Sequence, residues 1–143
     1  MKQPRVIHGT PQALNETLLG RPADVSGFLN RFVLLNGEVC EAPPAYIAVH
    51  LIQGLPSPPE PYVNAHCHPT CDEIGLVLGQ PGALEYEMVL NGEVHQVHSP
   101  AAIFIPAGTV HRATAMHGNG AYVCMLMDPK GPDPSTTARN PGI

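Results

Sequence analysis

The chain has 143 residues, of which 43% are hydrophobic and 13% charged, and its formal net charge is −5, which fits one domain with its own core. The seven Lys and Arg residues are scattered rather than clustered, so the sequence lacks the basic surface of a nucleic-acid-binding protein. Because no apolar run has the length of a membrane span and the first residues lack the apolar stretch of a secretory leader, we expect a cytoplasmic protein without a membrane partner.

The first 26 residues form an N-terminal arm that is polar and interrupted by proline. Within it, residues 11–19 (PQALNETLL) could form one short amphipathic helix, with Thr10 as its N-cap. We therefore expect this arm to be either helical or irregular.

Between residues 27 and 127 the sequence consists of short apolar segments separated by turns. The expected strands cover residues 27–35, 45–52, 62–68, 73–79, 84–90, 93–97, 101–106, 109–115 and 121–127. In one hairpin, Asn91-Gly92 is a favoured two-residue turn that would pair Met88 with His95 and Glu85 with His98. With 17 prolines and 14 glycines, the chain predicts an all-β sandwich or barrel over residues 27–127, followed by an irregular tail at 128–143.

One short segment, residues 65–73 (AHCHPTCDE), contains most side-chain types that bind first-row metals. His66 and His68 are two apart on the expected strand, so both point to one face, and their Cα atoms should lie roughly 6.6 Å apart. Cys67 points to the opposite face. Glu73 opens the next strand and brings a carboxylate from the side. This pattern predicts that His66, His68 and Glu73 converge on one point.

Two cysteines of this segment, Cys67 and Cys71, have two interpretations: they are either zinc ligands or ordinary packing residues. No second cysteine pair exists at the spacing of a zinc finger, which favours packing. The four cysteines, at positions 40, 67, 71 and 124, are expected to be free thiols in a reducing compartment.

A later segment, residues 106–111 (PAGTVH), follows after a strand and a hairpin. This order of segments resembles the two motifs of the cupin superfamily, G-x5-H-x-H-x3,4-E-x6-G and G-x5-P-x-G-x2-H-x3-N. Position by position, His66, His68 and Glu73 match the ligands of the first motif, and His111 matches the ligand of the second. The resemblance covers residues 45–127. The chain departs from the motifs at four turn or outer positions, Glu60, Gln80, Pro100 and Ala115.

The resemblance implies a double-stranded β-helix, a jelly-roll barrel whose mouth holds one divalent transition metal. His66, His68, Glu73 and His111 would bind that ion. Fe(II) is favoured, and Mn, Ni, Co, Cu or Zn would also suit three imidazoles and a carboxylate. The resemblance also implies a homodimer.

Several other residues are candidates for substrate contacts or proton transfer. Tyr62 and Asn64 share the expected face of His66 and could bond a substrate, Tyr62 also as a base, or simply pack. Gly75, Val77 and Ala113 lie on the inward side of their strands, where small side chains either leave room for a substrate or relieve crowding.

Two residues outside the motifs complete the candidate site. His50 shares a strand face with Tyr46 and is either an acid–base group or a structural histidine. Arg31 is the one basic residue of an apolar strand, and it either binds a substrate carboxylate or lies on the solvated face.

These residues indicate a metal-dependent enzyme acting on a small polar organic substrate. We lean towards a mononuclear non-haem iron dioxygenase, because the ligand set leaves positions open for substrate and dioxygen. The alternatives are a non-redox isomerase, lyase or dehydratase that uses Zn, Mn or Ni, and a non-catalytic ligand-binding protein.

Overall fold

The computed structural model describes residues 3–12, 25, 27–56, 59 and 61–130. These residues form strands and loops, and no helix occurs among them. The strands are β1 (Thr10–Pro11), β2 (Leu29–Leu35), β3 (Ala45–Ile52), β4 (Glu73–Leu78), β5 (Leu84–Leu90), β6 (Glu93–His98), β7 (Ala101–Ile105), β8 (His111–Gly118) and β9 (Gly120–Met127). The described part of the chain contains no apolar helix of membrane-spanning length.

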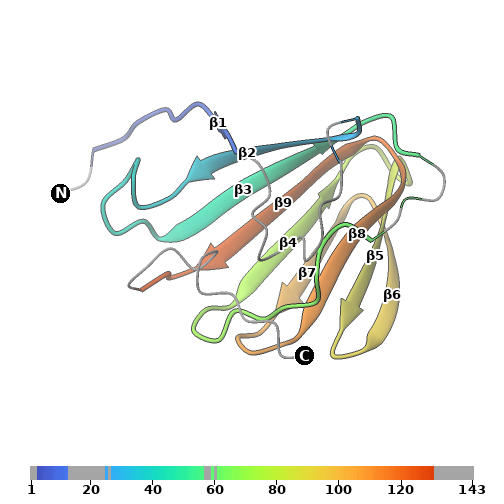
Figure 1. Ribbon diagram of the computed structural model, residues 1–143. Helices are drawn as coiled ribbons and strands as arrows, with labels where there is room; N and C mark the ends of the chain where they lie inside the picture. The colour runs from blue at the N-terminus through green and yellow to red at the C-terminus, as the bar shows by residue number, and fades with distance from the viewer. Residues whose placement is uncertain (1–2, 13–24, 26, 57–58, 60, 131–143) are drawn as a thin grey trace.

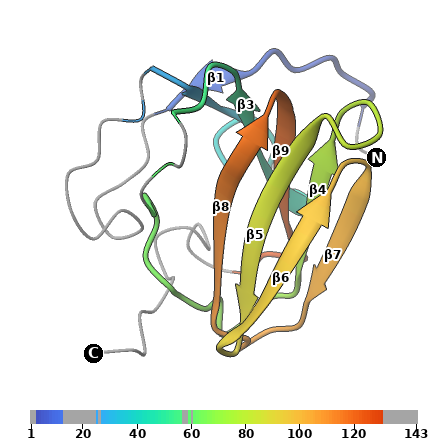
Figure 2. The same cartoon turned by 90° about the vertical axis from the view of Figure 1, so that its right-hand side faces the viewer.

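Two antiparallel sheets face each other and make a jelly-roll barrel. The larger sheet has the order β1-β2-β3-β9-β4-β7, and the smaller has the order β6-β5-β8 (Figure 1). Turning the molecule by 90° shows the smaller sheet in front of β3, β9 and β4 (Figure 2). The all-β jelly-roll fold expected from the sequence is therefore confirmed.

The alternation of side chains across each strand explains why the sequence folds into these two layers. In β4 and β5 every second residue is buried, and the residues between are partly exposed. The buried set meets between the sheets in one core. This core contains Leu29, Ile52, Tyr62, Val77, Leu84, Tyr86, Met88, Ile103, Ile105, Ala115 and Tyr122.

Most strand predictions agree with the structure to within three residues at either end. The hairpin pairing is confirmed, because Met88 lies opposite His95 and Glu85 opposite His98. Both Asn91 and Gly92 have positive φ angles, 48° and 82°, as a two-residue hairpin turn requires. The Glu85 carboxylate and the His98 ring lie 3.1 Å apart at the surface.

The predicted strand at residues 62–68 is wrong. There only His66 and Cys67 take part in a bridge, and that bridge is isolated. The main-chain N–H of Ala115 in β8 donates to the Tyr62 hydroxyl at 3.0 Å. A side chain therefore occupies the edge of β8 where a neighbouring strand would have supplied a carbonyl.

The N-terminal helix prediction is also wrong where the structure tests it. Thr10 and Pro11 form β1 and pair with Val33 and Phe32 of β2, so Thr10 does not cap a helix. Residues 13–19 lie outside the described residues, as do residues 131–143 of the expected tail.

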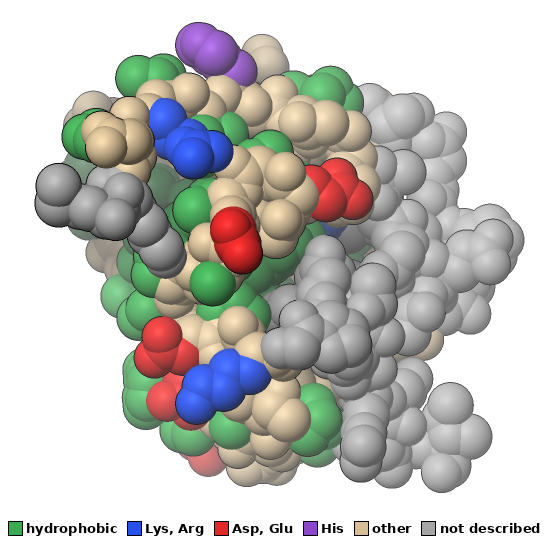
Figure 3. Space-filling model, turned by 90° about the vertical axis from the view of Figure 1, so that its left-hand side faces the viewer, with side chains coloured by type: hydrophobic (Ala, Val, Ile, Leu, Met, Phe, Trp, Pro, Cys, Tyr) green, Lys and Arg blue, Asp and Glu red, His purple; other side chains and the backbone are tan. Residues whose placement is uncertain are grey.

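Charged residues make up 13% of the chain. On the face shown in Figure 3, acidic and basic groups are interspersed among hydrophobic and other surface. This distribution agrees with the scattered Lys and Arg residues of the sequence.

Candidate metal centre

A reciprocal main-chain bridge brings the two histidine segments together. The N–H of His66 donates to the carbonyl of His111 at 3.0 Å, and the N–H of His111 donates to the carbonyl of His66 at 2.8 Å. Directly opposed residues of an antiparallel bridge point to the same face. The two imidazole rings accordingly lie side by side, with centroids 4.5 Å apart.

The turn before β8 is tied to the loop that carries His68. The N–H of Gly108 donates to the carbonyl of His68 at 3.0 Å, and the N–H of Ala107 donates to the Asp72 carboxylate at 2.8 Å. Gly108 has a φ of 82°, a conformation that glycine adopts without a steric cost. These contacts fix the position of His68 relative to β8.

Three imidazoles and one carboxylate meet at this place. One ring nitrogen from each of His66, His68 and His111 lies within 4.8 Å of the others, and all three residues are buried. Glu73, the first residue of β4, places its Oε2 atom 2.9 Å from Nε2 of His111 and 3.4 Å from Nε2 of His68. The structure thus brings together the four residues that match the motif ligands.

Hydrogen bonds to main-chain carbonyls determine which ring nitrogens remain available. Nδ1 of His66 lies 2.8 Å from the Asn64 carbonyl, and Nδ1 of His111 lies 2.9 Å from the Thr109 carbonyl. Because a carbonyl only accepts, each Nδ1 carries the proton, and Nε2 of a neutral ring is left as a lone pair. Histidines that bind a metal commonly use this arrangement.

The contact between His111 and Glu73 tests whether the site suits a cation. With a proton on Nδ1, a neutral His111 would direct its Nε2 lone pair at a carboxylate oxygen 2.9 Å away. Two acceptors at this distance repel each other, so a proton on Nε2 or a cation between the groups is needed. Three imidazoles and one carboxylate suit a divalent transition metal. The residues therefore fit such an ion.

The charges of the site follow from burial and from this pairing. Burial alone would raise the pKa of Glu73, but contacts with His111 and His68 lower that pKa to about 2. Burial would lower the pKa of His111, and the Glu73 carboxylate raises it above the ordinary value. Burial, with the neighbouring His111, lowers the pKa of His66 to about 4. At neutral pH, Glu73 is therefore an anion and the His66 imidazole is neutral.

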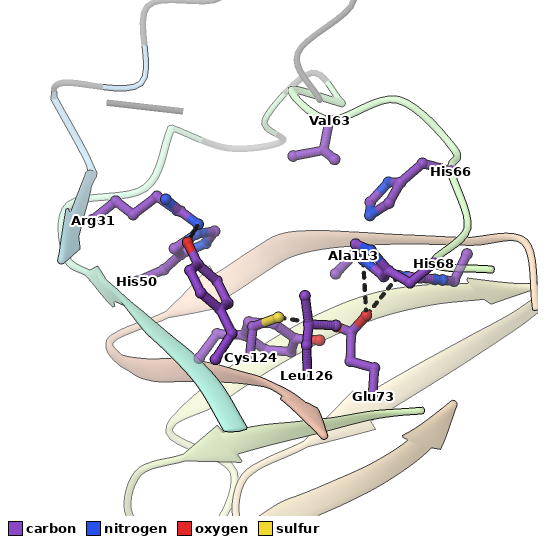
Figure 4. A pocket seen from close by; sticks show the side chains of 12 residues that line it. Arg31, His50, Val63, His66, His68, Glu73, Ala113, Cys124 and Leu126 are labelled. Atoms are coloured by element: carbon purple, nitrogen blue, oxygen red, sulfur yellow. Dashed lines mark hydrogen bonds and ion pairs between the residues drawn. The ribbon is translucent and has the colours of Figure 1, made fainter. Parts of the chain in front are cut away.

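A cavity opens next to these residues. Its volume is about 70 Å³. Since one water needs about 10–15 Å³ by this measure, the cavity has room for several waters or a small organic molecule. Figure 4 shows His66, His68 and Glu73 on one wall and Arg31 and His50 on the opposite wall. The cavity is lined by Arg31, Tyr46, His50, Val63, His66, His68, Glu73, His111, Ala113, Tyr122, Cys124 and Leu126.

Three of the other candidate residues lie at this cavity. Arg31 and His50 face each other on β2 and β3, and both line the cavity. Arg31 therefore does not lie on the solvated outer face. Ala113 lines the cavity from β8, two residues beyond the His111 ligand position.

The remaining candidates lie elsewhere. Tyr62 is buried in the core, where its ring packs edge-on against Phe28. Val77 is fully buried in the same core. Asn64 contributes its main-chain carbonyl, which orients His66. A Cβ at Gly75 would lie 3.1 Å from Cζ of Tyr122, so this glycine makes room for a tyrosine ring. We therefore leave the side chains of these four residues out of the proposed substrate site.

Sequence reasoning missed the contribution of β9. Tyr122, Cys124 and Leu126 alternate along this strand and line the cavity. Their period of two was visible in the sequence, but nothing in it showed which face of the strand turns inward. Cys71 packs in a small cluster with Leu126 and Cys124. The four cysteines form no disulfide, and none joins the histidine group, as expected.

Cys124 is the missed residue that touches the proposed metal ligands. Its thiol donates to Oε1 of Glu73 at 3.3 Å, while Oε2 faces the imidazoles. Burial, with the Glu73 charge, raises the pKa of the Cys124 thiol well above its ordinary value, so the sulfur keeps its proton. Cys124 therefore orients the carboxylate as a hydrogen-bond donor.

We expect Cys124→Ala to weaken metal binding roughly tenfold, the lower end of the cost of losing an outer hydrogen bond to a metal ligand. Cys124→Ser keeps a donor and should recover part of the affinity. Competition with a chromogenic chelator measures both constants. Cys67→Ser serves as the control and should leave metal content unchanged. Equal affinities for Cys124→Ala and the unchanged protein would remove this role from Cys124.

No protein-family model and no curated protein matches the sequence. Solved structures do match the fold. A cupin 2 domain-containing protein from Halorhodospira halophila is 18% identical, with a TM-score of 0.56, over 78% of this chain and 68% of that one. The Streptomyces polyketide cyclase RemF, from S. resistomycificus, is 18% identical with a TM-score of 0.56, over 100% of this chain and 87% of that one.

A third match is Pac13 from Streptomyces, described as a nucleoside dehydratase. It is 8% identical with a TM-score of 0.57, over 92% of this chain and 86% of that one. At these identities the likeness concerns the fold. Together with the jelly-roll topology and the positions of the motif residues, it establishes that this chain has the cupin fold.

Proposed function

We propose that this chain is an enzyme that uses one divalent transition metal, bound by His66, His68, Glu73 and His111, on a small polar organic substrate. The observation that carries the proposal is the meeting of three imidazole nitrogens within 4.8 Å, next to a carboxylate, at the wall of a cavity. A bound ion would supply Lewis acidity towards a substrate oxygen.

Polar groups across the cavity support an enzyme over a passive binding protein. Burial and the Arg31 charge lower the pKa of His50 to about 3, so its imidazole is neutral at pH 7 and has a lone pair that can accept a hydrogen bond from a substrate. Burial, with the nearby Glu73 charge, raises the pKa of Tyr122 well above its ordinary value, so its hydroxyl stays protonated and can donate. An entirely apolar cleft would have favoured ligand storage.

Among the possible types of enzyme, we favour a lyase, isomerase or dehydratase that uses Zn, Mn or Ni. Two structures of the same fold are described as a dehydratase and a cyclase. His50 and Tyr122 provide groups for proton transfer and hydrogen bonding, which this chemistry needs.

A mononuclear non-haem iron dioxygenase is the second candidate. The donor set supports it, because three imidazoles and one carboxylate also suit Fe(II) and leave positions open for substrate and dioxygen. The cavity is small, which suits a compact substrate in either case.

Two measurements separate these candidates. Elemental analysis of protein purified without added metal should find close to one transition-metal ion per chain, and a metal-free protein that also rejects added ions would contradict the proposal. Protein loaded with Zn, Mn, Ni or Fe(II) is then incubated with 2-hydroxy acids, diketones and phenolic acids. Deuterium uptake from D₂O, followed by NMR, reports proton transfer, whereas consumption of oxygen by the Fe(II) form supports the dioxygenase.

We also propose that the chain forms a homodimer through the outer face of the larger sheet. Apolar residues form rows across its strands: Leu51, Ala121 and Leu78 in one, and Ile47, Met125, Ile74 and Phe104 in another. Phe104 is 64% exposed, and Leu51 and Leu78 are also exposed. Such an exposed apolar face is typical of a protein contact.

Sedimentation equilibrium of the proposed dimer should give twice the chain mass, and Phe104→Glu should lower the measured mass to that of the monomer. A monomer at high concentration would contradict the proposal.

A further inference from the structure

We propose that the cavity wall formed by Arg31, Tyr46 and His50 binds a carboxylate group of the substrate, while a neighbouring hydroxyl or keto oxygen of the same molecule faces the proposed metal ligands. This inference rests on the proposed function and adds the substrate class to it, namely small hydroxy or keto acids. It stands on the position and the unbalanced charge of Arg31.

The strand register directs Arg31 into the cavity. Arg31 on β2 lies opposite His50 on β3, and opposed residues of antiparallel strands share a face. The same face of β3 carries Tyr46, whose hydroxyl accepts a hydrogen bond from Nη2 of Arg31 at 3.0 Å. Figure 4 shows the guanidinium beside His50, across from Glu73 and His66.

The guanidinium has no counter-ion among the described residues. Its two hydrogen-bond acceptors are the Tyr46 hydroxyl and the side-chain oxygen of Gln12, and both are neutral. The Nε atom is buried and has no hydrogen-bond partner within the described ranges of the chain. An arginine carries five N–H donors, so three of them have no acceptor in the part of the chain that the structure describes.

Among the described residues, Glu73 is the only carboxylate that lines the cavity, and it is engaged at the opposite wall. Glu73 lies within 2.9 Å of His111 and 3.4 Å of His68, and Cys124 donates to its other oxygen. The end of the cavity at Arg31 therefore carries an uncompensated positive charge beside apolar groups. A half-buried cation of this kind favours a bound anion.

The shape of the donors selects a carboxylate. A guanidinium binds a planar carboxylate through two parallel hydrogen bonds, and the single charge of the carboxylate matches the single charge of Arg31. The Tyr122 hydroxyl is buried without a partner in the described structure and lines the same cavity, so a further donor is available to an oxygen-rich ligand. The small volume restricts the ligand to a few heavy atoms beyond the carboxylate.

A bound carboxylate would also raise the pKa of His50. The Arg31 charge is one cause of the lowered pKa of His50, after burial. Neutralising that charge with a ligand removes this contribution and makes the imidazole a better proton acceptor.

Matched pairs of acids and amides test the inference. Acetate, glycolate, lactate and pyruvate are titrated by calorimetry into zinc-loaded and metal-free protein, each against its own amide. We expect at least one acid to bind about tenfold or more tightly than its amide, as charge-assisted hydrogen bonds imply. We expect Arg31→Gln to lose this preference and Arg31→Lys to keep part of it.

Arg112→Gln is the matched control, because Arg112 also lies on a barrel strand but pairs with Glu87 at the surface. This variant should bind like the unchanged protein. The inference is overturned if no acid binds better than its amide, or if Arg31→Gln keeps the preference while circular dichroism shows an unchanged fold. Metal content is measured separately. An acid preference without metal binding would contradict the proposed function alone, and metal binding without an acid preference would contradict this inference alone.

Discussion

Replacement of His111 by alanine should abolish stoichiometric metal binding. His111 is the ligand candidate contributed by the second motif, and its ring lies within reach of both neighbouring imidazoles and of Glu73. Loss of an outer-shell partner typically weakens metal binding 10–100-fold, so loss of a direct ligand should cost about 100-fold or more. Elemental analysis after dialysis and a chelator competition measure the effect.

His117→Ala is the control for this variant. His117 lies on the same strand but is exposed, away from the cavity. It should retain the metal content of the unchanged protein. We expect both variants to keep the fold, because the two main-chain hydrogen bonds between His111 and His66 do not depend on the side chain of residue 111. Circular dichroism checks this. Full metal content in a folded His111→Ala protein would disprove the ligand assignment and the enzymatic proposal with it.

Gly75→Ala should destabilise the fold by about 1–3 kcal/mol, the usual cost of overpacking a core. A Cβ at Gly75 would clash with the Tyr122 hydroxyl and lie 3.3 Å from Cε2 of the same ring. The ring cannot easily move aside, because it is stacked on Tyr86 with centroids 4.7 Å apart. Urea unfolding measures the free energy of unfolding.

Two further variants make this prediction specific. A Cβ at Gly37 meets nothing within 4 Å, so Gly37→Ala should change stability little. In a Tyr122→Phe background the clashing hydroxyl is absent, and Gly75→Ala should then cost less. Equal costs in both backgrounds would show that the Tyr122 hydroxyl is not the cause.

The residues of the candidate site could be predicted only in part from the sequence. The predicted convergence of His66 and His68 is confirmed, although only an isolated bridge and no strand occurs there, and motif order supplied Glu73 and His111. Strand alternation failed for Tyr62 and Asn64, because residues 62–65 form no strand and the period of two does not apply there. Gly75 was correctly placed inward, but its space is occupied by Tyr122, a residue 47 positions later in the chain.

By itself, the sequence determined the all-β class, the bounds of most strands and the four residues that we propose as metal ligands, because these depend on local alternation, on turn residues and on spacing within two short segments. Only the tertiary structure decided that Arg31, Tyr122 and Cys124 share the cavity with those four residues. The positions of Tyr122 and Cys124 depend on β9 lying between β3 and β4 and on the register of those pairings, and Arg31 depends in addition on the register of β2 with β3. Pairings between strands so far apart in the chain are set by packing of the whole barrel, and no local pattern of residues encodes them.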